Sequence, residues 1–313
     1  MEPLKSNEII GNWGTLLVPI EEDDEINFEK LRGEIDTLIS MHVNGIYSNG
    51  TAGEFYNQTE DEFDHLNLML AEKCEAARMP FQIGCSHPDP RLSLSRLKRA
   101  RELHPSAIQV VLPDWSAPSM KEVIGFLEIM VECATPVGLV LYNPPHAKKV
   151  LTPEEFHQIQ QAGIGLVGCK VADGDKGWYA RMKALVPDLS LFVPGHHLAT
   201  GVTMGANGAY SNVACLHPGA AQRWYDMMAG DMDAALEMEG RIQQFMQDHI
   251  IPFIRDAGYS NQAADKFMAA IGGWTDIRTR LRWPYKGVPD RHIESTRSIC
   301  RELLPEFFSG DME

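Results

Sequence analysis

The fold is decided by the stretch Val137-Gly138-Leu139-Val140-Leu141-Tyr142-Asn143 and by its repeat, Ile164-Gly165-Leu166-Val167-Gly168-Cys169-Lys170. Each is a short apolar run that closes on a polar side chain, as expected of a buried strand. Between them, Thr152 and Glu155 form a capping-box pattern, and Pro153 occupies the favoured first helical position. A strand, a helix and a second strand at this spacing predict a parallel pair with a right-handed crossover.

The same unit recurs along the whole chain. Eight apolar runs have the length and setting of strands: Trp13–Pro19, Gly45–Asn49, Phe81–Cys85, Ala107–Leu112, Val137–Asn143, Ile164–Lys170, Leu189–Pro194 and Gly208–Val213. Helical patterns separate most of them, so the sequence predicts an α/β fold, a (β/α)8 TIM barrel with a C-terminal helical extension. A doubly wound open sheet is the alternative, but Gly11-Asn12-Trp13-Gly14 does not fit its glycine-rich dinucleotide turn.

The domain organisation follows from where the helical patterns gather. After Val213 the chain predicts helices at Pro218–Ala229, Met232–His249, Gln262–Ile271 and Arg291–Leu304. We therefore expect residues 1–217 to form the barrel core. Residues 218–313 would supply its last helix and a helical cap within the same structural unit.

The composition and charge of the chain limit the classes of binding partner that we expect. The 313 residues are 44% hydrophobic and 23% charged, with a net charge of −15, which argues against nucleic acid or an anionic membrane as partner. No apolar run is long enough for a membrane span, and Met1–Lys5 does not resemble a signal peptide. The six cysteines are scattered without a CxxC pair, as in reduced core positions. A cytoplasmic protein with a small-molecule substrate is the expectation.

The carboxyl ends of the predicted strands carry the candidate chemistry, because barrel active sites lie on that face. Lys170 ends one strand, and an amine held among apolar side chains can lose its proton and attack a ketone. Tyr142 ends the neighbouring strand, where a phenol can move protons. The pair predicts a Schiff-base lyase acting on 2-oxo acids, with no cofactor beyond the covalent Lys170 imine. The competing interpretation is a surface lysine paired with Asp173 or Asp175.

Two further strand ends carry weaker signals. The turn Gly50-Thr51-Ala52-Gly53-Glu54 exposes consecutive backbone N–H groups that can cradle a carboxylate, and Thr51 adds a hydroxyl. His196 and His197 suggest a metal, but no neighbouring His-x-His or bridging carboxylate completes a ligand set. We expect no metal, and contacts with substrate hydroxyls or packing for these histidines.

At these residues the chain resembles the dihydrodipicolinate synthase/N-acetylneuraminate lyase superfamily of class I aldolases. The resemblance rests on Gly50–Glu54, on Tyr142-Asn143-x-Pro145 and on Lys170, and it covers nearly all of the sequence. It implies a (β/α)8 barrel, a homo-oligomer (a tetramer or dimer), and Lys170 as the Schiff-base residue for pyruvate or another 2-oxo acid. It also implies Tyr142 as proton shuttle, Thr51 as its relay, and the Thr51-Ala52 backbone as the carboxylate site, with Gly50 of the same turn as a further substrate-binding candidate.

Departures from the family pattern bear on the substrate. Ala52 replaces the usual second threonine, Ala147 stands where dihydrodipicolinate synthases carry an arginine, and Trp115 stands where they lend a tyrosine across the subunit interface. Dihydrodipicolinate synthase activity proper is therefore disfavoured. His196-His197 replaces the acidic residues of sialic acid lyases, and Tyr210 replaces a smaller aliphatic residue.

The leading hypothesis is a lyase that cleaves or dehydrates a 4-hydroxy-2-oxo acid, releasing or using pyruvate. The candidates for contact with the variable end of the substrate are Asn143, Trp115, His196, His197 and Tyr210. The alternative is a non-catalytic relative that binds or senses 2-oxo acids, motivated by Ala52 and the missing arginine.

Overall fold

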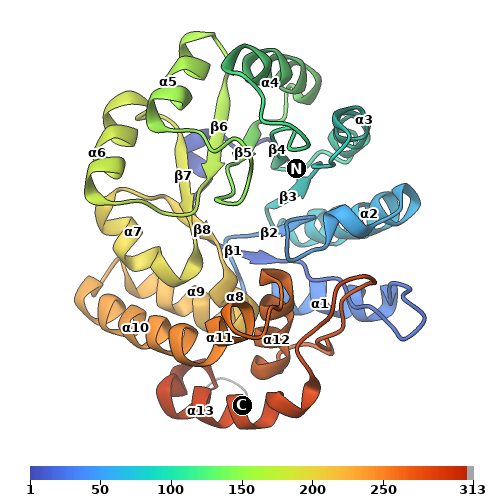
Figure 1. Ribbon diagram of the computed structural model, residues 1–313, viewed down its shortest axis with the longest axis vertical. Coiled ribbons are helices and arrows are strands. Elements are labelled where there is room, and N and C mark those ends of the chain that lie inside the picture. The colour runs from blue at the N-terminus through green and yellow to red at the C-terminus, as the bar shows by residue number, and fades with distance from the viewer. Residues whose placement is uncertain (309–313) are drawn as a thin grey trace.

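The computed structural model describes residues 1–308, and eight parallel strands close into a barrel in sequence order, from β1 to β8 (Figure 1). The predicted (β/α)8 barrel is confirmed. Its strands are β1 Gly11–Thr15, β2 Gly45–Ser48, β3 Phe81–Gly84, β4 Ala107–Val111, β5 Leu139–Tyr142, β6 Leu166–Lys170, β7 Ser190–Val193 and β8 Gly208–Tyr210.

Helices surround the barrel, and a second group covers one side of it, drawn in orange and red in Figure 1. The helices that follow the first seven strands are α1 Phe28–Ser40, α2 Glu60–Ala77, α3 Pro90–Arg101, α4 Met120–Ala134, α5 Pro153–Gln161, α6 Lys176–Leu185 and α7 Leu198–Met204. The later helices are α8 Asn212–Leu216, α9 Pro218–Met227, α10 Met232–Phe245, α11 Ile251–Arg255, α12 Asn261–Gly272 and α13 Ile293–Leu303.

The capping box predicted at Thr152 is present, and the same arrangement begins two other helices. The side chains of Thr59, Ser119 and Thr152 each accept a hydrogen bond from the backbone N–H three residues later, and the glutamate there accepts from the cap backbone N–H in return. These reciprocal bonds satisfy N–H groups that have no partner inside the helix. They fix the starts of α2, α4 and α5.

Alternation along the strands fills the barrel interior with side chains. One interior cluster joins inward residues of six strands and the N-terminal segment: Ile9, Trp13, Tyr47, Ala107, Val140, Phe192 and Tyr210. Ser190 donates a hydrogen bond of 2.6 Å to the Ile9 carbonyl, so the N-terminal segment is tied to the barrel. The interior is therefore packed, and only the carboxyl end of the strands remains for a ligand.

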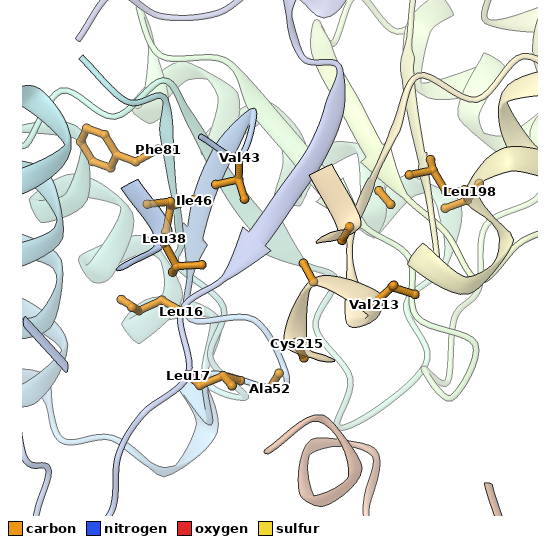
Figure 2. Close-up of a cluster of buried hydrophobic side chains, with 14 of the residues drawn as sticks. Leu16, Leu17, Leu38, Val43, Ile46, Ala52, Phe81, Leu198, Val213 and Cys215 are labelled. Atoms are coloured by element: carbon orange, nitrogen blue, oxygen red, sulfur yellow. The ribbon is translucent and has the colours of Figure 1, made fainter. Parts of the chain in front are cut away.

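The larger hydrophobic core lies between the strands and the surrounding helices. Figure 2 shows part of it, including Leu38 of α1, Ile46 of β2, and Val43 in the loop between these two elements. A Cβ at Gly14 would come within 3.0 Å of a Leu38 methyl group, so the absence of a side chain there lets α1 pack closely on β1. This core holds the strand ends in place.

Some predicted boundaries were wrong. The first strand begins at Gly11 and ends at Thr15, so Leu16–Pro19 belongs to the following loop. The predicted helix Met232–His249 ends at Phe245, and a π-helical turn, Met246–Ile250, leads into α11. Pro252 has no N–H to donate to the preceding turn, which is a physical reason for the regular ladder to stop here.

The C-terminal cap is joined to the barrel through buried charges. Lys266 of α12 is fully buried, and its ammonium group donates to Glu54 at 2.6 Å and to the Arg280 carbonyl at 2.7 Å. Arg282 pairs with both oxygens of Glu62 at the start of α2. Residues 218–308 therefore pack as part of the barrel. The remainder of the predicted cap, 309–313, lies outside the described residues.

Candidate active site

The polar strand ends lie at one level of the barrel. In the strand register, Val111 is opposite Tyr142, Tyr142 is opposite Lys170, and Lys170 is opposite Phe192. Residues at one level of neighbouring parallel strands point to the same side of the sheet. Tyr142 and Lys170 therefore face the same space at the carboxyl end of the barrel.

Lys170 lies among aromatic rings. Its Nζ is 4.5 Å from the centroid of the Tyr142 ring, 5.3 Å from that of Tyr47 and 5.6 Å from that of Tyr210. Lys170 is half-buried, and within residues 1–308 it forms no ion pair, neither with Asp173 nor with Asp175. The surface ion pair considered from the sequence is not found. The amine is held by rings and carries no carboxylate partner that would compete with a substrate.

The hydroxyl groups of Tyr47 and Tyr210 are both engaged in hydrogen bonds with other side chains. The Thr15 hydroxyl donates to the Tyr47 hydroxyl, and the Tyr210 hydroxyl donates to Gln82 Oε1 at 2.6 Å. Burial raises the pKa of both phenols well above the ordinary value. Tyr47 and Tyr210 therefore stay neutral and shape the wall around Lys170.

The Gly50–Glu54 turn lies beside this wall. Thr51 and Ala52 line the inner cavity with Lys170, whereas Gly50 does not. A Cβ at Gly50 would come within 2.7 Å of the Tyr47 ring, so glycine makes room for that ring. Across the part of the chain that the structure describes, no hydrogen bond joins Thr51 to Tyr142. Thr51 and Tyr142 nevertheless line the same cavity.

The site consists of two adjoining cavities that share Thr51, Tyr142 and His146. The inner cavity, of about 330 Å³, contains Lys170 and is closed by apolar side chains of the cap. These are Met246, Ile250, Ile251, Ile254, Ala264 and Met268. The outer cavity, of about 290 Å³, includes Trp115, Ala147 and Lys148. A small keto acid fits the inner cavity, and a longer substrate can extend into the outer one.

The remaining predicted contacts divide into two groups. His196 lines the inner cavity, and burial together with the neighbouring His197 lowers its pKa to about 4. Trp115 lines the outer cavity with 89% of its surface exposed. His197 lies behind His196, 3.6 Å from Asp173, and is not among the residues lining either cavity.

Asn143 does not reach the cavity. Its amide exchanges two hydrogen bonds with the backbone of Leu151, accepting from the N–H at 2.9 Å and donating to the carbonyl at 3.0 Å. Both functions of the side chain are therefore used to close the loop after β5. The expected contact between Asn143 and substrate is not supported, and its role is to position the segment after Tyr142.

One ionisable group of the inner cavity was missed from the sequence. Asp265 of α12 lines this cavity together with Tyr142 and Lys170. Burial raises the pKa of Asp265 to about 7, and the positive charge of Lys170 opposes part of this shift. The candidates drawn from the sequence were polar residues at the ends of predicted strands, and Asp265 was not among them because it lies in a cap helix.

Residues 1–308 contain no group of three or more His, Cys, Asp or Glu side chains placed to hold a metal ion. Over the same residues, none of the helices has the length and apolar character needed to cross a bilayer.

The fold and the site together define a (β/α)8-barrel protein with a lysine amine among phenols at the carboxyl end of its strands. The chain belongs to the Dihydrodipicolinate synthetase family, whose model matches residues 8–291.

Named relatives place this membership in context. The chain is 28% identical to a 4-hydroxy-tetrahydrodipicolinate synthase of Exiguobacterium sp., over 72% of this chain and 78% of that protein. It is 22% identical to a trans-O-hydroxybenzylidenepyruvate hydratase-aldolase of Sphingobium xenophagum, over 94% and 93%. A similar solved structure is YagE of E. coli K12 in complex with pyruvate, with a TM-score of 0.82, 19% identity, and coverage of 94% and 98%.

Proposed function

We propose that the protein is a Schiff-base-forming lyase, a class I aldolase that cleaves or dehydrates a 4-hydroxy-2-oxo acid and releases or uses pyruvate. The observation that carries the proposal is the Lys170 amine 4.5 Å from the Tyr142 ring, in a cavity where it has no ion-pair partner within residues 1–308. An uncommitted amine can add to a ketone, and the resulting iminium withdraws electrons from the adjacent carbon.

The other residues would act around this imine. The backbone of Thr51 and Ala52 would hold the substrate carboxylate, as a turn of exposed N–H groups can do. Tyr142 would take the C4 hydroxyl proton when the C3–C4 bond breaks, with Thr51 as its relay. The electron pair of that bond would pass into the iminium and give an enamine.

The cavity walls favour an acceptor with an apolar substituent. The cap lines the inner cavity with Met246, Ile250 and Ile254, and apolar side chains of this kind leave the hydroxyls of a sugar chain without partners on that wall. Ala147 lines the outer cavity where an arginine would be needed for dihydrodipicolinate synthesis. The name of the Sphingobium relative, a hydratase-aldolase, is compatible with an alkyl- or aryl-substituted 2-oxo acid.

A homo-oligomer is part of the proposal. Trp115 is 89% exposed at the rim of the outer cavity, and large exposed aromatic side chains are typical of interfaces. Light scattering on the purified protein should give the mass of a dimer or tetramer. A monomer mass would contradict the proposed homo-oligomer.

A product screen tests the function. The protein is incubated with 4-hydroxy-2-oxo acids bearing alkyl, aryl or polyhydroxyl groups, and pyruvate release and unsaturated products are followed separately. Turnover of at least one class is expected, led by the alkyl and aryl compounds. Trapping of pyruvate by borohydride without turnover of any compound would favour the binding or sensing alternative, and absence of both would end the proposal.

A further inference from the structure

Asp265 lines the inner cavity from the cap, whereas Tyr142 and Lys170 line it from strands β5 and β6. Asp265 belongs to α12, which packs on α8, and α8 contacts β1 (Figure 1). In the closed order of eight strands, β1 and β5 lie across the barrel from each other. A substrate joined to Lys170 would therefore share this cavity with the phenol of Tyr142, from a barrel strand, and with the carboxyl group of Asp265, from a cap helix.

The Asp265 carboxyl group has no structural partner. Among residues 1–308 it accepts no hydrogen bond and forms no ion pair, whereas Lys266, the next residue, is paired with Glu54. Asp265 is half-buried, and a carboxylate that helps to hold a fold is normally paired or hydrogen-bonded. Asp265 instead lines the inner cavity with its oxygens free for a ligand.

The surroundings allow this carboxyl group to carry a proton at neutral pH. Its pKa is raised to about 7 by burial, with Lys170 acting in the opposite direction. The neighbouring groups Tyr47 and Cys215 stay neutral because burial raises their pKa values, and His196 stays neutral because burial lowers its own to about 4. The charge that faces Asp265 is thus that of Lys170, and an iminium keeps this charge.

We propose that Asp265 is the general acid for loss of the C4 hydroxyl group, so that the enzyme is a hydro-lyase as well as a carbon–carbon lyase. This inference rests on the proposed imine at Lys170. It adds a second proton-transfer group, because a hydroxide ion is a poor leaving group unless it is protonated as it departs.

The proton balance of the steps is complete. As the imine forms, Tyr142 gives its proton to the departing C2 hydroxyl, which leaves as water, and a phenolate remains. For dehydration, the phenolate takes a C3 proton and yields an enamine. The enamine electrons then form the C3–C4 double bond and expel the C4 oxygen, which takes the Asp265 proton and leaves as water.

Cleavage uses the same phenolate differently. There the phenolate takes the C4 hydroxyl proton, the C3–C4 electron pair passes into the iminium, and an aldehyde departs. Asp265 gives no proton in this branch. The enamine then takes the Tyr142 proton at C3, and hydrolysis of the iminium releases pyruvate and Lys170. In the dehydration branch, hydrolysis of the unsaturated imine returns Lys170 and the 3-ene-2-oxo acid, and the proton released restores Asp265. In the reverse direction, the Asp265 carboxylate would activate water for addition at C4.

The test compares two products from one substrate. Three proteins are incubated with 4-hydroxy-2-oxo-4-phenylbutanoate: wild type, Asp265→Asn and the control Asp256→Asn. The control removes an exposed acid that pairs with Arg255. The unsaturated product is followed by its ultraviolet absorbance, and pyruvate by a coupled assay. Asp265→Asn should lose about 10²- to 10⁴-fold in dehydration while pyruvate release stays close to wild type. Asp256→Asn should match wild type in both.

Several outcomes would overturn the inference. It fails if wild type forms no unsaturated product, if Asp265→Asn dehydrates at the wild-type rate, or if both products fall equally while pyruvate trapping by borohydride is unchanged. If Asp265→Asn does not fold, Asp265→Glu replaces it, and an unaltered dehydration rate and pH profile in that variant count against the inference. Absence of a pyruvate adduct in wild type would instead refute the proposed function.

Discussion

Two lysines of this protein are held in opposite ways. Lys266 is fully buried at the junction of cap and barrel, and its charge is matched by Glu54 at 2.6 Å. Lys170 is half-buried at the carboxyl end of the strands, where three aromatic rings surround its amine and no residue in 1–308 pairs with it. The Lys266 amine therefore stabilises the fold, whereas the Lys170 amine is available to a ligand.

The difference shows that burial alone does not identify a reactive amine. The Lys266 ammonium group donates to Glu54 and to the Arg280 carbonyl, so it is held by the fold, whereas the Lys170 amine forms no hydrogen bond or ion pair within residues 1–308. The availability of a partner therefore separates the structural lysine from the chemical one. Changing each lysine should produce a different kind of defect.

The largest expected effect comes from Lys170→Arg. Arginine keeps the positive charge but cannot form an imine with a ketone, so turnover should fall below detection. Pyruvate with borohydride should leave the variant unmodified. Lys73→Arg, at a surface ion pair with Asp36, serves as control and should keep wild-type activity. Residual turnover of Lys170→Arg near the wild-type level would show that this amine is not the nucleophile.

Next in size is Tyr142→Phe. Loss of the phenolic hydroxyl removes a proton shuttle, and turnover should fall about 10²- to 10⁴-fold. Adduct formation with pyruvate should persist at least in part, because the amine remains. The control is Tyr259→Phe in the cap, away from the cavity walls. An unchanged rate for Tyr142→Phe would remove this residue from the mechanism.

Lys266→Met should affect the fold first. It leaves Glu54 buried beside the Gly50–Glu54 turn without its partner, and breaking a buried pair in this way costs about 3–5 kcal/mol of unfolding free energy. Denaturant unfolding of wild type and variant measures this loss. The folded fraction should still trap pyruvate. A variant as stable as wild type would mean that the pair does not hold the cap.

The smallest effect concerns Asp265 and pH. The folded protein holds the Asp265 proton more tightly than the unfolded chain between the ordinary pKa of 3.8 and about 7, so stability falls as pH rises through this window. Asp265→Asn removes that fall. The stability that Asp265→Asn gains over wild type should be larger at pH 8 than at pH 4, by about 1–2 kcal/mol. This value is smaller than the full pKa shift would give, because solvent in the cavity screens the charge. Parallel stability–pH curves would contradict the raised pKa.

The sequence was informative where periodicity and position coincide. Tyr142 and Lys170 end apolar runs, and parallel strands bring their carboxyl ends to one face, so both could be placed at the site. Tyr47 lies inside a run instead of at its end. Parallel strands buried on both faces read as continuous apolar segments, so the sequence alone does not say that its ring points inward.

Asp265 and Asn143 illustrate a second limit. Asp265 is a polar residue within an amphipathic helix, and only the packing of α12 against the barrel turns it toward the cavity. Asn143 follows Tyr142 directly, yet the loop after β5 folds back and uses its amide for Leu151. Both outcomes depend on tertiary contacts between distant or irregular segments, which local patterns do not encode.

The central claim is that the Lys170 amine forms an imine with 2-oxo acids. Peptide mapping by mass spectrometry after incubation with pyruvate and borohydride tests it most directly. The account predicts one reduced pyruvate adduct, located on Lys170, with Lys266 unmodified. An adduct on another lysine, or a protein left unmodified under these conditions, would contradict it.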